Sequence, residues 1–209
     1  MKKILVLQIS LLIIFSAAGV GLLFSTDIYN DVQRKIVEEL CLSCVKLKPD
    51  TKVEYLFDTA NDESHPTFVL ENLSYGPVLI TYRIDFCPGC DDLEENLIDV
   101  LNISFGPYDV FYKRISFEDE NITFIHINTN QISEESELYK SRMIYDTVGT
   151  RGNPMMVFVT YGYNHGFIEP AYATLYGLEE KDIDDRNEEL KEYISESISL
   201  YNYHKHVID

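Results

Sequence analysis

The chain of 209 residues contains no tryptophan and is poor in basic side chains. Its 17 lysine and arginine residues stand against 35 aspartate and glutamate residues, so the net charge is −18. Nucleic acids and anionic membrane surfaces repel a surface of this charge, which argues against both as ligands. A glycine-rich phosphate loop and a serine nucleophile elbow are also missing. The five histidines show no metal-ligand spacing, and we expect neither a resident metal nor a cofactor.

Cysteine is scarce, and the four cysteines fall into two C-x-x-C pairs. The pair formed by Cys87 and Cys90 follows the apolar, β-branched run 77–84, which predicts a strand. It precedes the run 91–101, whose apolar residues share one helical face. At the N-terminus of a helix, the dipole and the unpaired N–H groups favour a thiolate. A thiolate with a second cysteine nearby can carry out thiol–disulfide exchange.

Two other interpretations of the Cys87 and Cys90 pair are a structural disulfide and half of a zinc site. The second pair, Cys41 and Cys44, could supply the other half of such a site. However, 42 residues separate Cys44 from Cys87, whereas zinc ribbons use about 15–20. The spacing and the strand–helix context therefore favour exchange chemistry.

The segment 148–154 lies far along the chain and leads into a strand-like run at 155–161. It resembles the G-x-R-G-x-P segment that precedes the last hairpin of thioredoxin. The matching residues are Gly149, Arg151, Gly152 and Pro154, together with Cys87 and Cys90. The resemblance covers roughly residues 52 to 203.

This resemblance to the thioredoxin-like superfamily implies roles for several residues. Cys87 would be the exposed nucleophile and Cys90 the resolving thiol. Pro154 would be a cis-proline that faces the pair, and the backbone beside Asn153 would pair with an extended substrate. The substrate groove would be formed by Phe86, Pro88, Gly89 and Asn153.

The order of the predicted elements also matches thioredoxin. The pair Cys87 and Cys90 and its helix are followed by a polar stretch at 104–121 and a strand at 122–127. Then come a helix from an N-cap at Ser133 to Tyr145, the hairpin, and an acidic helix at 179–201. We therefore predict an α/β, thioredoxin-like fold for residues 51–205, with a central mixed β-sheet flanked by helices. An N-terminal hydrophobic helix and one extra helix would precede it.

The chain departs from thioredoxin around the cysteines. Phe86 stands where thioredoxins usually carry tryptophan, and Thr81 stands where they bury an aspartate that helps to deprotonate the second cysteine. Asp85 is a candidate replacement for that aspartate, although strand alternation places it on the same face as Cys87. Four carboxylates crowd the start of the helix and oppose its dipole by raising the thiol pKa: Asp91, Asp92, Glu94 and Glu95.

The N-terminus combines a short basic start with an apolar run at 4–24, long enough to cross a bilayer core of about 30 Å. Residues 1–25 are either a cleaved signal peptide or an uncleaved signal anchor, and the length of the run favours the anchor. Both interpretations place the rest of the chain outside the cytoplasm. Three sequons would then be open to glycosylation, at Asn72, Asn102 and Asn121.

Residues 26–50 are predicted to be a helical segment that carries the second cysteine pair on its apolar face. Three interpretations of Cys41 and Cys44 remain open at this point. They are a second redox pair that exchanges electrons with Cys87 and Cys90, a structural disulfide, or two buried thiols.

We therefore expect an extracytoplasmic protein-disulfide oxidoreductase, tethered to the membrane by residues 4–24 or secreted after cleavage. Its partners would be secreted or membrane proteins that contain cysteines, and a membrane-bound electron donor or acceptor is a further candidate. The alternative is a thioredoxin-like domain that binds proteins, or handles copper or zinc, without redox turnover.

Overall fold

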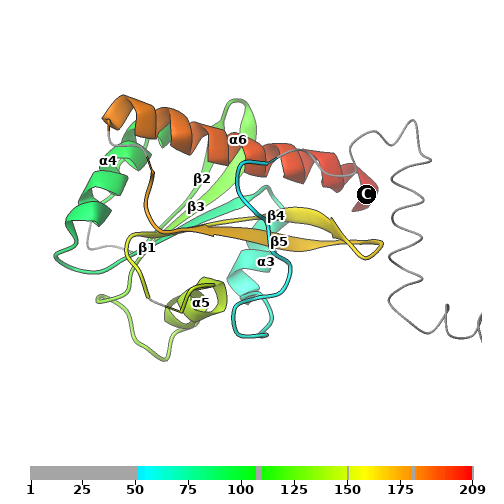
Figure 1. The fold of residues 1–209 in the computed structure, drawn as a ribbon, viewed down its shortest axis with the longest axis horizontal. Coiled ribbons are helices and arrows are strands. Elements are labelled where there is room, and N and C mark those ends of the chain that lie inside the picture. The colour runs from blue at the N-terminus through cyan, green and yellow to red at the C-terminus, as the bar shows by residue number, and fades with distance from the viewer. Residues whose placement is uncertain (1–50, 107–109, 150, 180–181, 209) are drawn as a thin grey trace, which may run out of the picture. The chain divides into compact units, whose positions relative to one another are not determined.

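The computed structural model describes residues 51–106, 110–149, 151–179 and 182–208. These residues form an α/β domain in which helices cover both faces of a mixed five-stranded sheet (Figure 1). The predicted fold class is thus confirmed at the level of an α/β domain with a mixed sheet. The apolar run at 4–24 and the cysteines of the segment 26–50 lie outside the described residues. None of the helices within the described ranges is long and apolar enough to cross a membrane.

The sheet has the strand order β2-β3-β1-β4-β5. Its strands are β1 (Val78–Arg83), β2 (Phe111–Phe117), β3 (Glu120–Asn128), β4 (Met155–Asn164) and β5 (Phe167–Leu175). β1 pairs in parallel with β3 and antiparallel with β4, and the two edge strands are antiparallel to their neighbours. All six residues of β1 are buried, which explains why its sequence reads as an almost continuous apolar run.

Four helices flank the sheet in the described residues: α3 (Thr67–Leu73), α4 (Pro88–Leu101), α5 (Glu137–Tyr145) and α6 (Ile183–Ile208). In Figure 1, α4 and α6 lie above the sheet, and α3 and α5 lie below it. Alternate residues of β1 therefore enter different cores. Leu79 packs with Leu97 of α4 on one face, and Ile80 packs with Tyr145 of α5 on the other.

The structure differs from the sequence prediction in the polar stretch before β3. Part of that stretch, for which no strand was predicted, is the strand β2, which forms an antiparallel hairpin with β3. β2 is an edge strand, and most of its side chains are exposed, so it lacks the apolar alternation of a half-buried strand. Its apolar contacts come from Phe111, Ile115 and Phe117.

Helix boundaries differ as well. α5 begins after an N-cap at Ser136, whose Oγ accepts a hydrogen bond from the N–H of Tyr139 at 3.2 Å. Ser133, the predicted N-cap, instead lies in the turn before it and accepts a hydrogen bond from the Ser136 hydroxyl. Both serines suit an N-cap chemically, and the position of the turn decides between them.

The three sequons differ in accessibility. Asn72 is buried, and its side chain donates to the carbonyl of Phe68 at 2.7 Å and accepts from the Tyr112 hydroxyl. Asn102 and Asn121 are exposed. A glycan on the folded domain would therefore fit at Asn102 or Asn121 and not at Asn72.

Close packing around two glycines makes a testable prediction about the fold. A Cβ added at Gly76 would lie 1.9 Å from the carbonyl oxygen of Asn121, which is backbone and cannot rotate away. A Cβ at Gly162 would lie 2.7 Å from the ring of Phe57, a half-buried side chain that can rotate. Urea unfolding should show a loss of about 1–3 kcal/mol for Gly162→Ala and a larger loss for Gly76→Ala. Equal losses would contradict this account.

Candidate active site

The cysteine pair lies at the junction between β1 and α4. Cys87 is the N-cap of α4 and has extended backbone angles, and its Sγ accepts a hydrogen bond from the N–H of Cys90 at 3.2 Å. Pro88 occupies the first helical position, where its missing N–H costs nothing. The two cysteines form a disulfide with a Cα–Cα distance of 5.2 Å. Cys87 is 8% exposed and Cys90 only 1%, so Cys87 is the cysteine that another protein can reach.

Phe86, directly before the pair, is the most exposed large apolar residue in the described chain, with 98% of its surface open to solvent. Its φ of 57° lies in the left-handed region, which bulky residues rarely adopt. The chain therefore presents an aromatic ring beside the disulfide at a cost in backbone energy. Such outliers gather at functional sites.

The loop before β4 reaches the cysteine pair, and its Asn153–Pro154 peptide bond is cis. A Cβ added at Gly89 would lie 3.3 Å from Cδ of Pro154, so the proline ring packs against the backbone between the two cysteines. Pro154 is buried and lines a small cavity together with Cys90, and this cavity has no room for a water molecule. Asn153 is half-buried, and its side-chain amide donates to the carbonyl of Arg151 at 3.2 Å. The fold thus brings together two segments that are distant in the sequence.

Two charged residues of α5 and its C-cap hold this loop. The carboxylate of Asp146 accepts hydrogen bonds from the N–H groups of Gly149 at 3.0 Å and Arg151 at 2.8 Å, and from the Tyr176 hydroxyl. The Arg142 guanidinium donates to the carbonyls of Arg151 and, at 3.1 Å, Gly152. Neither residue could be recognised from the sequence, because nothing in a helical pattern shows that the end of the helix will contact a loop.

The hydrogen bonds to Asp146 determine its ionisation. Burial by itself would raise the pKa of this carboxyl, but the hydrogen bonds from Tyr176, Arg151 and Gly149 outweigh burial and lower the pKa below its ordinary value. A lowered carboxyl pKa stabilises the fold above the unfolded-state pKa, and this contribution is lost as the pH falls through the folded-state value.

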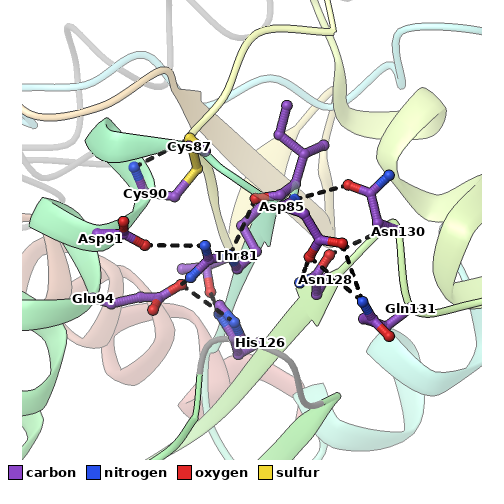
Figure 2. Close-up of polar contacts among 12 residues, drawn as sticks. Thr81, Asp85, Cys87, Cys90, Asp91, Glu94, His126, Asn128, Asn130 and Gln131 are labelled. Atoms are coloured by element: carbon purple, nitrogen blue, oxygen red, sulfur yellow. Dashed lines mark hydrogen bonds and ion pairs between the residues drawn. A yellow bond between two sulfur atoms is a disulfide. The ribbon is translucent and has the colours of Figure 1, made fainter.

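Buried charge lies beneath Cys90. Arg83, at the end of β1, directs its guanidinium to Glu94 and to Asp91 at 3.0 Å, and both carboxylates belong to α4 (Figure 2). The Nε2 atom of His126, on β3, lies 3.6 Å from the Glu94 carboxylate. Its Nδ1 shares a hydrogen bond of 2.9 Å with the Thr81 hydroxyl. Arg83, Glu94 and His126 are buried, whereas Asp91 is exposed.

The buried groups have shifted pKa values. Burial raises the pKa of Glu94, and the hydrogen bond and charge of Arg83 only partly oppose this effect. Burial and the nearby Arg83 charge lower the pKa of His126 to about 4, so its imidazole is neutral at pH 7. The unfolded chain binds a proton at this histidine below about pH 6.5. His126 therefore disfavours the folded state increasingly as the pH falls from that value toward 4.

Asp85, the candidate acceptor from the sequence, is occupied elsewhere. Its carboxylate accepts hydrogen bonds from the side-chain amides of Asn128 at 2.8 Å and Gln131 at 3.2 Å, as Figure 2 shows. Its backbone N–H donates to the Asn130 side chain at 2.8 Å. Glu94 is the one acidic residue among the described residues that line the cavity at Cys90, and its carboxylate contacts Arg83. The sequence contained a signal for it, because Glu94 lies four residues after Cys90 on the apolar face of α4.

Comparisons with known proteins returned no match: no family model fits this chain, and neither a curated protein nor a solved structure resembles it significantly. The site therefore has to be interpreted from its own geometry. That geometry is a disulfide at a strand–helix junction, with a proline loop against it and buried charge beneath it.

Replacement of Asp146 tests how the loop is held. We expect Asp146→Asn to lower the free energy of unfolding at pH 7 by about 1–3 kcal/mol, the range for hydrogen bonds to a charged group. The difference from the parent protein should shrink as the pH falls below about 4, where the unfolded chain takes up the proton, and vanish below the lowered pKa of the folded state. Asp99→Asn, at an exposed position of α4, is the control and should change little. A difference independent of pH would contradict this role for the carboxylate.

The ion pair between Arg83 and Glu94 makes a separate prediction. Arg83→Met leaves the Glu94 carboxylate buried beside an apolar side chain, and we expect a loss of about 3–5 kcal/mol in urea unfolding. The double variant Arg83→Met/Glu94→Met removes both charges and should recover most of that loss. If the losses of the two single variants simply add in the double variant, the two side chains do not interact.

Proposed function

We propose that this protein is a thioredoxin-like thiol–disulfide oxidoreductase that acts outside the cytoplasm on proteins that contain cysteines. The observation that carries this proposal is the Cys87–Cys90 disulfide at the N-terminus of α4. This position stabilises a thiolate at Cys87 when the pair is reduced. The contact between Pro154 and Gly89 adds a second wall beside the same sulfurs.

The proposed reaction is reversible exchange in two steps. In the reducing direction the Cys87 thiolate attacks a substrate disulfide, forms a mixed disulfide and releases one substrate thiolate. Cys90 then loses its proton and attacks the Cys87 sulfur, which restores the Cys87–Cys90 disulfide and releases the second substrate thiolate. The substrate gains two electrons and the cysteine pair loses two, and the reverse sequence oxidises a substrate dithiol.

Protein substrates fit the surface around Cys87. Phe86 offers an exposed aromatic ring next to the sulfur, and aromatic rings contribute strongly to contacts between proteins. The chain beside Asn153 can pair with an extended substrate segment, as the resemblance to thioredoxin implies. The apolar run at 4–24 supports a membrane-tethered location, and Cys41 and Cys44 would be a second redox pair or a structural one.

Serine variants of the two cysteines test the proposal. The oxidised full chain, mixed with a disulfide-bonded model protein in a glutathione buffer, should exchange disulfides. Cys87→Ser should abolish this activity, because it removes the attacking thiolate. Cys90→Ser should instead accumulate a mixed disulfide through Cys87, detectable as a mass increase that a reductant reverses.

The second cysteine pair provides the control for this experiment. A Cys41→Ser/Cys44→Ser variant should retain exchange with the model protein, since the proposed chemistry takes place at Cys87. Wild-type protein that neither oxidises nor reduces the model protein would refute the proposed function. Full activity in Cys87→Ser would also refute it.

A further inference from the structure

Resolution of a mixed disulfide requires Cys90 to lose a proton in a place that water hardly reaches. Cys90 is 1% exposed, and it lies beneath Cys87 at the first turn of α4. Burial raises a thiol pKa, so a thiol here needs a nearby group that accepts its proton. Thr81, on the strand below, has a hydroxyl that shares its hydrogen bond with His126 and is no acceptor for a thiol proton at neutral pH.

Glu94 is placed for this task. It follows Cys90 by four residues on α4, so the two side chains project from the same face of the helix, with Cβ atoms about 5–6 Å apart. Both residues line the small cavity that Pro154 also borders. Among the described residues that line this cavity, Glu94 is the only one with a carboxylate.

The charged groups around Glu94 come from three elements. β1 contributes Arg83, which donates to the carboxylate, and β3 contributes the neutral His126. α4 itself contributes Cys90 and the exposed Asp91, which shares Arg83. α6 packs on α4, but its Arg186 points toward Asp92, at 3.7 Å. Tyr82 also lines the cavity, and its hydroxyl is hydrogen-bonded to Ser141 at 2.7 Å.

This environment keeps Glu94 available as a base. Arg83 holds the carboxylate in place, and burial raises the carboxyl pKa toward that of a thiol, which makes proton transfer between them easier. His126 leaves its Nε2 atom facing Glu94 without a hydrogen-bond partner in the described part of the chain. It can therefore donate to the carboxylate after a small movement.

We propose that Glu94 accepts the proton of Cys90 when the mixed disulfide is resolved, and returns it when the pair is reduced. This inference rests on the proposed function and assigns the missing acid–base group to this chain. In the resolving step the S–H bond of Cys90 breaks and the proton moves to the Glu94 carboxylate. The sulfur electron pair forms the bond to Cys87, and the substrate thiolate leaves with the electrons of the broken S–S bond.

Glu94→Gln tests the proposal, because glutamine keeps the shape and a hydrogen-bond acceptor but cannot take up the proton at neutral pH. The full chain carrying Cys41→Ser/Cys44→Ser is reduced, mixed with excess oxidised glutathione and quenched in acid at intervals. Mass spectrometry then separates the glutathione adduct of Cys87 from the closed disulfide. This readout gives the rate of Cys87 attack and the rate of resolution by Cys90 as separate quantities.

At pH 7 we expect resolution in Glu94→Gln to be about 100-fold slower than in the parent protein, or more. The rates should converge once the pH exceeds the pKa of the Cys90 thiol, which burial places above the ordinary value of about 8.5, because hydroxide then removes the proton. Attack by Cys87 should stay within about twofold. The control is Asp91→Asn, which removes the charge of the other carboxylate bound to Arg83 and should not slow resolution. Glu94→Asp should restore part of the rate at pH 7.

Three outcomes would overturn the proposal. They are parental resolution in Glu94→Gln, a slowing that is the same at every pH, and an equal slowing in Asp91→Asn. A parent protein that forms neither the glutathione adduct nor the closed Cys87–Cys90 disulfide would instead refute the proposed function, so the two failures are distinguishable.

A measurement on wild-type protein covers the case in which Glu94→Gln does not fold. The 13C chemical shift of the Glu94 carboxyl is followed from pH 3 to pH 10 in the disulfide and dithiol forms. If the titrations of Glu94 and Cys90 are coupled, the titration curve of the dithiol form should show a second inflection that the curve of the disulfide form lacks. Identical curves in the two forms would overturn the proposal.

Discussion

The ion pair between Arg83 and Glu94 is the interaction on which the site depends. It joins the end of the central strand β1 to the first turns of α4, the helix that begins at the cysteine pair. A charge at either position would be costly to bury alone, so each residue requires the other. The pair therefore links the orientation of α4, which carries both sulfurs, to the sheet. It also holds the carboxylate of Glu94 on the same buried face of α4 as Cys90, whereas Thr81 on β1 carries no charge.

On the other side of the cysteine pair lies a loop that is held in place by residues from elsewhere in the chain. The loop before β4 takes its hydrogen bonds from Arg142 and Asp146, at the end of a helix on the opposite face of the sheet. These bonds place Pro154 against Gly89. The surface around Cys87 is thus assembled with residues from both layers of helices. The exposed Phe86 completes it from the strand–helix junction.

The elements that carry the cysteines could be predicted from the sequence because their signals are local. The buried strand β1 and the amphipathic helix α4 have strong periodic patterns, and the C-x-x-C pair lies between them. β2 could not be predicted, because an exposed edge strand has little apolar alternation. The N-cap of α5 was assigned to Ser133 instead of Ser136 because several polar residues in that turn could serve.

By itself the sequence indicated the chemistry proposed for this protein, because two cysteines at a helix N-terminus depend on residues within one turn of each other. It also determined the strong negative charge and the α/β order of elements. Only the tertiary structure decided which carboxylate lies near Cys90. Asp85 is closer to Cys87 in the sequence, yet it binds amides that follow β3, whereas Glu94 faces the cavity. The choice depends on how β1, β3 and α4 pack together, and a contact between three elements leaves no pattern in any one of them.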